Sequence, residues 1–288
     1  FFSTLSGTIN YSGDCSSSDN SADADNNTIT FNALSEGLHW NCKISVTSSS
    51  SNLTSDNLSV DNFTIDISAP SLSQVTAVPT PANDSTPSYT FSSDEAGTIT
   101  YGGNCSSSDT SADADNNTIT FNALGDATHA NCSITVRDNA GNTSSVLSVN
   151  SFTIDTTAPT LSQVTAVSTP DNDSTPSYTF NSNEAGTITY GGSCSSSDNS
   201  SINGNNTITF NALSDDTYSD CTITVTDNAS NASNALSVNT FVVDTTGPTV
   251  AEVTAVTTPG NDTTPSYTFS SNETGTITYG GSCSSSDN

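Results

Sequence analysis

Apolar and polar residues alternate over short stretches of this chain. A single threonine separates Ile119 from Phe121, and another separates Ile134 from Val136. Alternation over a few residues rich in Thr, Val, Ile, Tyr and Phe is typical of β-strands with one buried face. Clusters of Ser, Asn, Asp and Gly, which favour turns, lie between these stretches. Because no segment has the 3.6-residue period of a helix, the pattern predicts an all-β protein.

The alternating pattern repeats along the chain. The segment GTINYSGDCSSSDN at Gly7 returns in similar form at Gly97, Gly186 and Gly275, so the period is about 89 to 90 residues. A unit of this length can enclose its own core, unlike solenoid repeats of about 20 to 50 residues. The sequence therefore predicts tandem domains arranged as beads on a string. The expected boundaries are 1–68 for a repeat lacking its first strands, 69–157 and 158–246 for complete repeats, and 247–288 for a truncated repeat.

One complete repeat has the strand spacing of an immunoglobulin-like β-sandwich. Turn signals recur every 8 to 12 residues or so, as in such sandwiches. The strands expected in the second repeat, in the order A, B, C, E, F and G, are Leu72–Val78, Ser88–Ser92, Thr98–Gly102, Thr118–Leu124, Cys132–Arg137 and Leu147–Ile154. The intervening stretch Ser106–Asn117 is interpreted as a weak strand D or a loop. The predicted fold is thus a series of tandem immunoglobulin-like sandwiches.

Six of the seven cysteines form three pairs with the same spacing of 27 residues. In each repeat one cysteine ends strand C and the other begins strand F, and these strands are antiparallel neighbours in this topology. The expected disulfides are Cys15–Cys42, Cys105–Cys132 and Cys194–Cys221, while Cys283 has no partner at that spacing. Each bond should contribute about 3 kcal/mol to the free energy of unfolding. Paired cysteines also indicate an oxidising compartment, outside the cytosol.

The charge balance excludes several classes of function. The chain has 2 Lys or Arg and 30 Asp or Glu residues, for a formal net charge of -28. Nucleic-acid binding requires clustered basic residues, and so does attachment to an anionic membrane surface. No run of about 18 apolar residues is present, so direct membrane insertion is not expected. An enzyme is not expected either, because no phosphate-binding loop is present and Tyr218 replaces the histidine found at positions 39 and 129.

Strand topology is expected to bring acidic residues together where one repeat meets the next. The linker entering a repeat, its B–C turn and its F–G loop should all reach the same end of the sandwich. The groups so formed are Asp66, Glu95 and Asp138 for the second repeat; Asp155, Glu184 and Asp227 for the third; and Asp244 and Glu273 for the fourth. Converging carboxylates repel one another unless a cation lies among them, and oxygen ligands suit Ca²⁺. The alternative is that these acids are solvated turn residues.

Short segments of the repeats resemble a known family. IDTTAP, NEAGTITY and TDNASN are similar to segments of the tandem immunoglobulin-like extender domains of giant bacterial surface adhesins. Such adhesins are secreted, and calcium often stiffens the junctions between their extenders. The resemblance covers the whole chain and implies calcium-ligand roles for the eight acidic residues named above. The first repeat departs from it, because Ser48 replaces the aspartate of the F–G loop.

Together these features predict a non-catalytic, extracellular structural segment of a surface adhesin or fibre, stiffened by calcium and disulfides. A spacer should repeat itself, and the F–G loops of the repeats are nearly alike. One alternative is a glycan- or ice-binding module. Another is a filament subunit, in which Thr249–Ser271 of one chain supplies the strands missing from the first repeat of the next. The expected partners are adjacent repeats of the same or an identical chain, with lateral or head-to-tail self-assembly left open.

Overall fold

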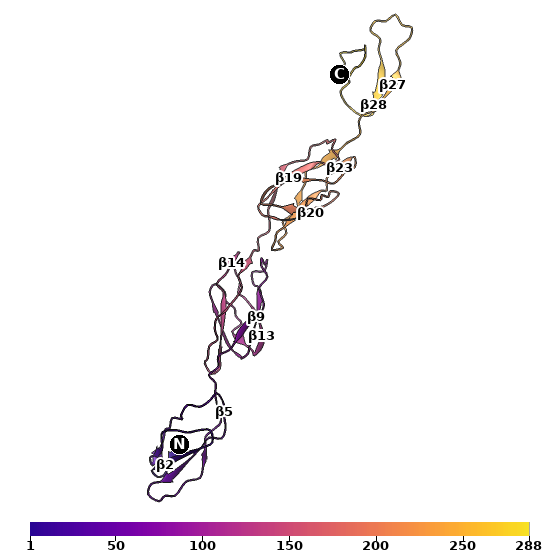
Figure 1. Ribbon diagram of the computed structural model, residues 1–288. Helices are drawn as coiled ribbons and strands as arrows, with labels where there is room; N and C mark the ends of the chain where they lie inside the picture. The colour runs from indigo at the N-terminus through magenta and orange to yellow at the C-terminus, as the bar shows by residue number, and fades with distance from the viewer. Residues whose placement is uncertain (288) are drawn as a thin grey trace. The chain divides into compact units, whose positions relative to one another are not determined.

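A computed structural model describes residues 1–287 of the chain (Figure 1). Every regular element in this range is a β-strand, from β1 (Phe2–Ser3) to β28 (Thr268–Ser271), which confirms the all-β prediction. The described residues include no helix long and apolar enough to cross a membrane. The chain forms two compact units, one of residues Phe1–Asp155 and the other from Thr156 onward.

Two antiparallel sheets of the second repeat, which lies in the first unit, share one core. In the first sheet β10 (Ser88–Ser93) is central, with β9 (Leu72–Thr76) and β13 (Asp115–Thr120) on either side. The second sheet has the order β12 (Ser111–Ala112), β11 (Gly97–Gly102), β15 (Ser133–Asp138) and β16 (Leu147–Ser148). These sheets correspond to strands A–B–E and C–F–G, so strands C and F are antiparallel neighbours as the sequence predicts.

A third, two-stranded sheet departs from the expected strand list. It joins β14 (Ala127–His129) to β17 (Phe152–Ile154), and Ala82 bridges to Ile154 in parallel. The expected strand Leu147–Ile154 is therefore split, because its first part pairs with β15 and its second part pairs with β14. The expected strand ending at Leu124 stops at Thr120, opposite Ser88. Pro87, the next residue along the partner, has no N–H with which to continue the ladder.

Aromatic side chains fill the core of the second repeat. Tyr89, Phe91, Phe121 and Phe152 are fully buried, and the rings of Phe121 and Phe152 stack with their centroids 6.1 Å apart. Alternate residues of β10 are buried, as expected for a strand with one face toward the core. The disulfide between Cys105 and Cys132 belongs to the same cluster. A small number of apolar residues thus forms the complete core of this sandwich.

The third repeat, in the second unit, has the same arrangement. Its sheets are β18 (Leu161–Thr165), β19 (Ser177–Ser182) and β22 (Gly204–Thr209); β21 (Ser200–Ser201), β20 (Gly186–Gly191), β24 (Thr222–Thr226) and β25 (Leu236–Ser237); and β23 (Asp216–Tyr218) with β26 (Phe241–Val243). Tyr178, Phe180, Phe210 and Phe241 occupy the buried aromatic positions.

The first repeat retains its C–F–G sheet but has a smaller core. The sheet contains β3 (Ser21–Ala22), β2 (Gly7–Ser12), β6 (Lys43–Ser48) and β7 (Leu58–Ser59). The remaining pairs are β5 (Gly37–His39) with β8 (Phe63–Ile65) and β1 with β4 (Asp25–Asn26). Only Ile9, Ala22 and Ile44 are buried in its described core cluster. In the second unit, the hairpin of β27 (Val250–Thr254) and β28 leaves its apolar side chains exposed.

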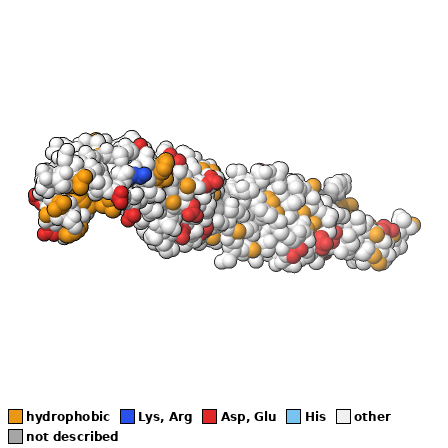
Figure 2. All heavy atoms as spheres, turned by 90° about the horizontal axis from the view of Figure 1, so that it is seen from below, with side chains coloured by type: hydrophobic (Ala, Val, Ile, Leu, Met, Phe, Trp, Pro, Cys, Tyr) orange, Lys and Arg blue, Asp and Glu red, His pale blue; other side chains and the backbone are white. Residues whose placement is uncertain are grey.

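Uncharged atoms cover most of the face drawn in Figure 2, and acidic side chains outnumber basic ones there. The excess of acidic over basic residues in the sequence is therefore also visible on this face.

Candidate metal centre

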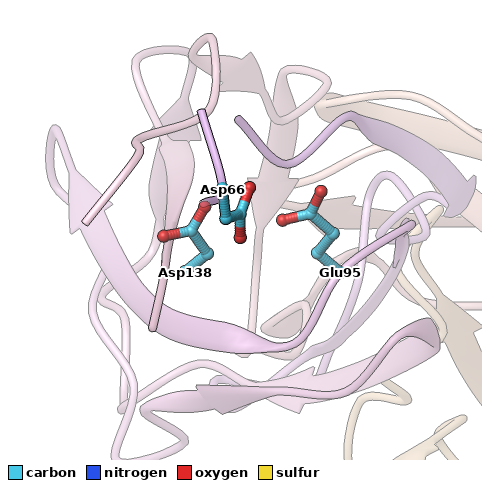
Figure 3. Close-up of side chains that lie close together, drawn as sticks. All are labelled: Asp66, Glu95 and Asp138. Carbon is cyan, nitrogen blue, oxygen red and sulfur yellow. The ribbon is translucent and has the colours of Figure 1, made fainter. Parts of the chain in front are cut away.

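Three carboxylates meet beside the linker that enters the second repeat. Asp66 directly follows β8, Glu95 lies in the turn between β10 and β11, and Asp138 is the last residue of β15. One carboxylate oxygen from each lies within 4.8 Å of the others. Figure 3 shows the Asp66 carboxylate between those of Asp138 and Glu95. The structure thus brings together the acidic group that the strand topology predicts for this repeat.

The F–G loop holds Asp138 in place. Its Oδ1 accepts hydrogen bonds from the backbone N–H groups of Gly141 at 2.6 Å and Asn142 at 2.8 Å, and its Oδ2 accepts one from Asn142 Nδ2 at 2.9 Å. Asp138 is 8% exposed, so burial opposes its ionisation. The bonds from the Asn142 side chain and from the loop amides outweigh this desolvation and lower the pKa of Asp138. The residue is therefore preorganised as a carboxylate.

Asn142 also connects the loop to the linker. Its Nδ2 donates to the backbone oxygen of Asp66 at 3.2 Å. One amide group therefore contacts the Asp138 carboxylate and the linker backbone. This contact ties the backbone of Asp66 to the loop that carries Asp138.

A hydrogen bond fixes the backbone of Glu95, whereas burial and neighbouring acids disfavour its ionised carboxylate. Ser93 Oγ donates to the Glu95 carbonyl oxygen at 2.6 Å, which fixes the B–C turn. Desolvation, followed by repulsion from Asp66, Asp138, Asp94 and Glu36, raises the pKa of Glu95. A cation among the carboxylates would reverse this effect, because opposite charge favours the ionised form.

The donor chemistry fits a hard divalent cation. Asp66, Glu95 and Asp138 offer only oxygen, which suits Ca²⁺ and disfavours Zn²⁺ at a site without His or Cys. Ca²⁺ accepts carboxylates, backbone carbonyls and water in flexible geometry, so three carboxylates from separate loops are a suitable set. When bound, the ion would neutralise the mutual repulsion of these groups.

The third repeat places two of its predicted acids in the same way. Glu184 follows β19 in the B–C turn, and one of its carboxylate oxygens lies within 4.8 Å of an Asp227 oxygen. Asp227 accepts hydrogen bonds from Asn231 N and Asn231 Nδ2, both at 2.9 Å, as Asp138 does from Asn142. Asp155 is the last residue of the first unit and stands at the linker position that Asp66 occupies before the second repeat.

The other predicted acids form no comparable group. Within residues 1–287, Asp244 and Glu273 belong to no cluster of three acidic or metal-ligating side chains. Asp244 Oδ1 accepts a bond from Thr246 N at 3.3 Å, and Glu273 Oε1 accepts one from Asn272 Nδ2 at 3.2 Å. In the first repeat, Ser48 Oγ accepts bonds from the amides of Ser50 and Ser51, so a hydroxyl orders the loop there.

The structure contains the three disulfides at the expected spacing. They join Cys15 to Cys42, Cys105 to Cys132 and Cys194 to Cys221, each across 27 residues. Cys283 is unpaired and exposed. The first cysteine of each pair lies three residues beyond the end of strand C, and the second directly precedes strand F.

Sequence reasoning missed two polar features. Glu36 lies close enough to Glu95 to raise its pKa, and the signal that could have identified it is an acid at the same position in each repeat: Glu36, Asp126 and Asp215. The second feature is the burial of one ring nitrogen in each histidine. His39 Nδ1 and His129 Nδ1 are buried without a hydrogen-bond partner, and no sequence pattern predicts this.

Comparisons with known proteins give remote structural similarities. No family model matches the chain, and no curated protein matches it. Among solved structures it is similar to invasin, described as a bacterial integrin-binding protein, with 14% identity, 86% of this chain covered and a TM-score of 0.33. A second is Salmonella alpha-2-macroglobulin reacted with methylamine, with 10% identity, 91% of this chain and 22% of that chain covered, and a TM-score of 0.20. The chain spans 55% of the length of the invasin chain.

Proposed function

We propose that this chain is a non-catalytic structural segment of an extracellular bacterial adhesin or fibre, in which calcium stiffens the junctions between repeats. The observation that carries the proposal is the convergence of Asp66, Glu95 and Asp138 beside a linker. Asp66 belongs to the linker, whereas the other two carboxylates belong to the second repeat. An ion held by all three would therefore join the linker to the sandwich that follows it.

Two further features support an extracellular spacer. Three disulfides suit an oxidising compartment outside the cytosol. The second and third repeats also carry the same acids in the same turns, Glu95 and Asp138 in one and Glu184 and Asp227 in the other. A spacer needs this repetition, because each junction performs the same task.

Calcium titration of the full chain tests the proposal. Calorimetry on chelator-treated protein should detect binding with half-saturation at about 10⁻⁴ to 10⁻³ M, the range of extracellular modules. At a calcium concentration of about 100 times Kd, the free energy of unfolding should rise by about 2.7 kcal/mol per coupled site. Absence of heat and of any calcium-dependent stabilisation would contradict the proposal.

Glu95→Gln gives a sharper version, because its effect should change sign with calcium. In chelator the substitution removes repulsion and should raise the melting temperature; in calcium it removes a ligand and should lower it. The number of bound ions should fall by one, and Glu184→Gln should produce the same loss in the third repeat. The matched control is Asp61→Asn, an exposed acid of the first repeat. An equal response in the control would show that net charge, and not a site, is responsible.

A further inference from the structure

The pairing of short strands places an acid beside each linker. In the first repeat Gly37 pairs with Ile65, so Glu36 lies next to Asp66 across the two strands. In the third repeat Asp216 pairs with Val243, which places Asp215 next to Asp244. Antiparallel register therefore gives the linker an acidic neighbour on its own repeat.

In the third repeat this neighbour accepts three hydrogen bonds from the linker. Asp215 Oδ1 accepts from Thr245 N at 3.0 Å and from Thr245 Oγ1 at 2.7 Å, while Oδ2 accepts from Thr246 Oγ1 at 2.6 Å. The bonds from the Thr246 hydroxyl, the Thr245 hydroxyl and the Thr245 amide lower the pKa of Asp215. Both carboxylate oxygens are therefore occupied by donors from the linker.

In the first repeat Glu36 makes the corresponding contact. Glu36 Oε1 accepts from Ser68 Oγ at 2.7 Å, and Ser68 N donates to Asp66 Oδ1 at 3.2 Å. Ser68 therefore links Glu36 to Asp66, one of the three grouped carboxylates. Asp126 stands at the same position of the second repeat.

We infer that this acid, called here the clamp acid, is a positioning residue: in the first repeat Glu36 holds the Ser68 hydroxyl so that Asp66 faces Glu95 and Asp138. The inference rests on the proposed calcium site and adds a residue to it. The clamp acids are Glu36 in the first repeat, Asp215 in the third and, by position, Asp126 in the second.

The contacts favour positioning over direct ligation. Glu36 is not among the three side chains whose oxygens converge, and one of its oxygens already accepts the Ser68 hydroxyl. Asp66 directly follows β8, and the N–H of Ser68, two residues further along, donates to Asp66 Oδ1, so the side-chain direction of Asp66 depends on what holds Ser68. Groups that orient a metal ligand in this way typically change metal affinity by about 10- to 100-fold when they are removed.

Three variants of the full chain test the clamp: Glu36→Ala, Ser68→Ala and Glu36→Gln. The first two remove the hydrogen bond from either side, whereas glutamine keeps an acceptor oxygen without the charge. Amide hydrogen exchange is measured in chelator on the peptide 66–71, and during calcium titration on the peptide 138–143, which reports this site alone. Asp61→Ala is the matched control.

Positioning predicts a definite pattern. Glu36→Ala and Ser68→Ala should each speed exchange of the linker in chelator and raise the calcium concentration for half-protection about tenfold. A fourth variant that combines Glu36→Ala with Ser68→Ala should be no worse than either single one, since both substitutions remove the same bond. Glu36→Gln should retain most of the linker protection and calcium affinity, and the control should match the unmodified chain.

Other patterns would overturn the inference. Unchanged linker exchange in both Glu36→Ala and Ser68→Ala would show that no clamp operates. If Glu36→Gln were as damaging as Glu36→Ala while Ser68→Ala had no effect, the charge of Glu36 would act directly on the ion. If the unmodified chain showed no calcium protection, the proposed function would fail, and the linker exchange measured in chelator would still decide whether the clamp exists.

Discussion

The second and third repeats bury the same four aromatic residues and differ at the ring that stacks on the last of them. His129 stacks on Phe152 with ring centroids 5.4 Å apart, and Tyr218 stacks on Phe241 at 5.2 Å. His129 Nε2 lies 3.1 Å from the Gly125 oxygen, and Tyr218 Oη donates to the Ser214 oxygen at 3.0 Å. Only the histidine leaves a buried polar atom, Nδ1, without a partner. The position therefore requires a stacked ring with one hydrogen bond, and two different side chains satisfy it.

The surface loops give the opposite contrast. The loop after strand C carries Asp113 and Asp115 in the second repeat, but Ile202 and Gly204 in the third. The B–C and F–G acids, by comparison, are the same residue types in both repeats, and Asn142 and Asn231 make the same two hydrogen bonds to the F–G aspartate. Ordinary solvated turns can vary as the first loop does. The constancy of the second group is what a shared task at the junctions would require.

The largest expected effect tests whether the two cores are equivalent. Phe152→Ala and Phe241→Ala should each cost about 3 to 5 kcal/mol, because each removes a fully buried ring from the same place. Chemical denaturation monitored separately in each repeat would measure both losses. Val146→Ala, at a residue that is 65% exposed, should change little. A loss confined to one repeat would break the equivalence.

Removing a disulfide should have the next largest effect. Replacing Cys105 and Cys132 by serine should cost about 3 kcal/mol, and replacing Cys194 and Cys221 should cost the same, since both bonds close loops of equal length. Peptide mapping without reductant gives the pairing, and thermal unfolding gives the cost. Links between repeats would contradict the C–F assignment.

Exchanging His129 and Tyr218 should change the stability of the two repeats by a smaller amount, with opposite signs. Tyr218→His should destabilise the third repeat by about 1 kcal/mol, because it introduces a buried polar atom without a partner. His129→Tyr should stabilise the second repeat by a similar amount, with calorimetric melting as the measurement. Destabilisation by both changes would mean that each pocket is shaped for its own ring.

The smallest effect concerns acid pH in the third repeat. Hydrogen bonds from Thr246 and Thr245 lower the pKa of Asp215, so the ionised residue stabilises the folded state at pH values above its unfolded-state pKa of about 4. That contribution should fade as the pH drops through the lower, folded-state pKa. Asp215→Asn should therefore be less stable at neutral pH, with the difference from the unmodified chain vanishing in acid. A constant difference from pH 7 to pH 2 would exclude this titration.

The sequence predicted those features that depend on periodicity or on strand order. Alternation identified the strands, and the pairing of Cys105 with Cys132 followed from the adjacency of strands C and F. The meeting of Asp66, Glu95 and Asp138 likewise needed only the knowledge of which loops share one end of a sandwich.

Features that depend on single contacts could not be predicted. Strand β14 has three residues, too few to show a period, and it exists because β17 supplies its hydrogen bonds. The clamp contact of Glu36 requires the register of that kind of pair, which the linear sequence does not contain. The unpartnered nitrogen of His129 depends on how its ring lies against Phe152.

The disulfide between strands C and F has a mechanical consequence. A pulling force carried along the chain would pass from Cys105 to Cys132 through the sulfur bridge, bypassing the 27-residue step between them. At about 3.3 to 3.6 Å per residue, a repeat that unfolds under tension would extend by about 90 to 100 Å less with the disulfide oxidised than with it reduced. Under load, the redox state of the surroundings would therefore set how far each repeat can lengthen, and a stretched oxidised chain would keep that segment looped.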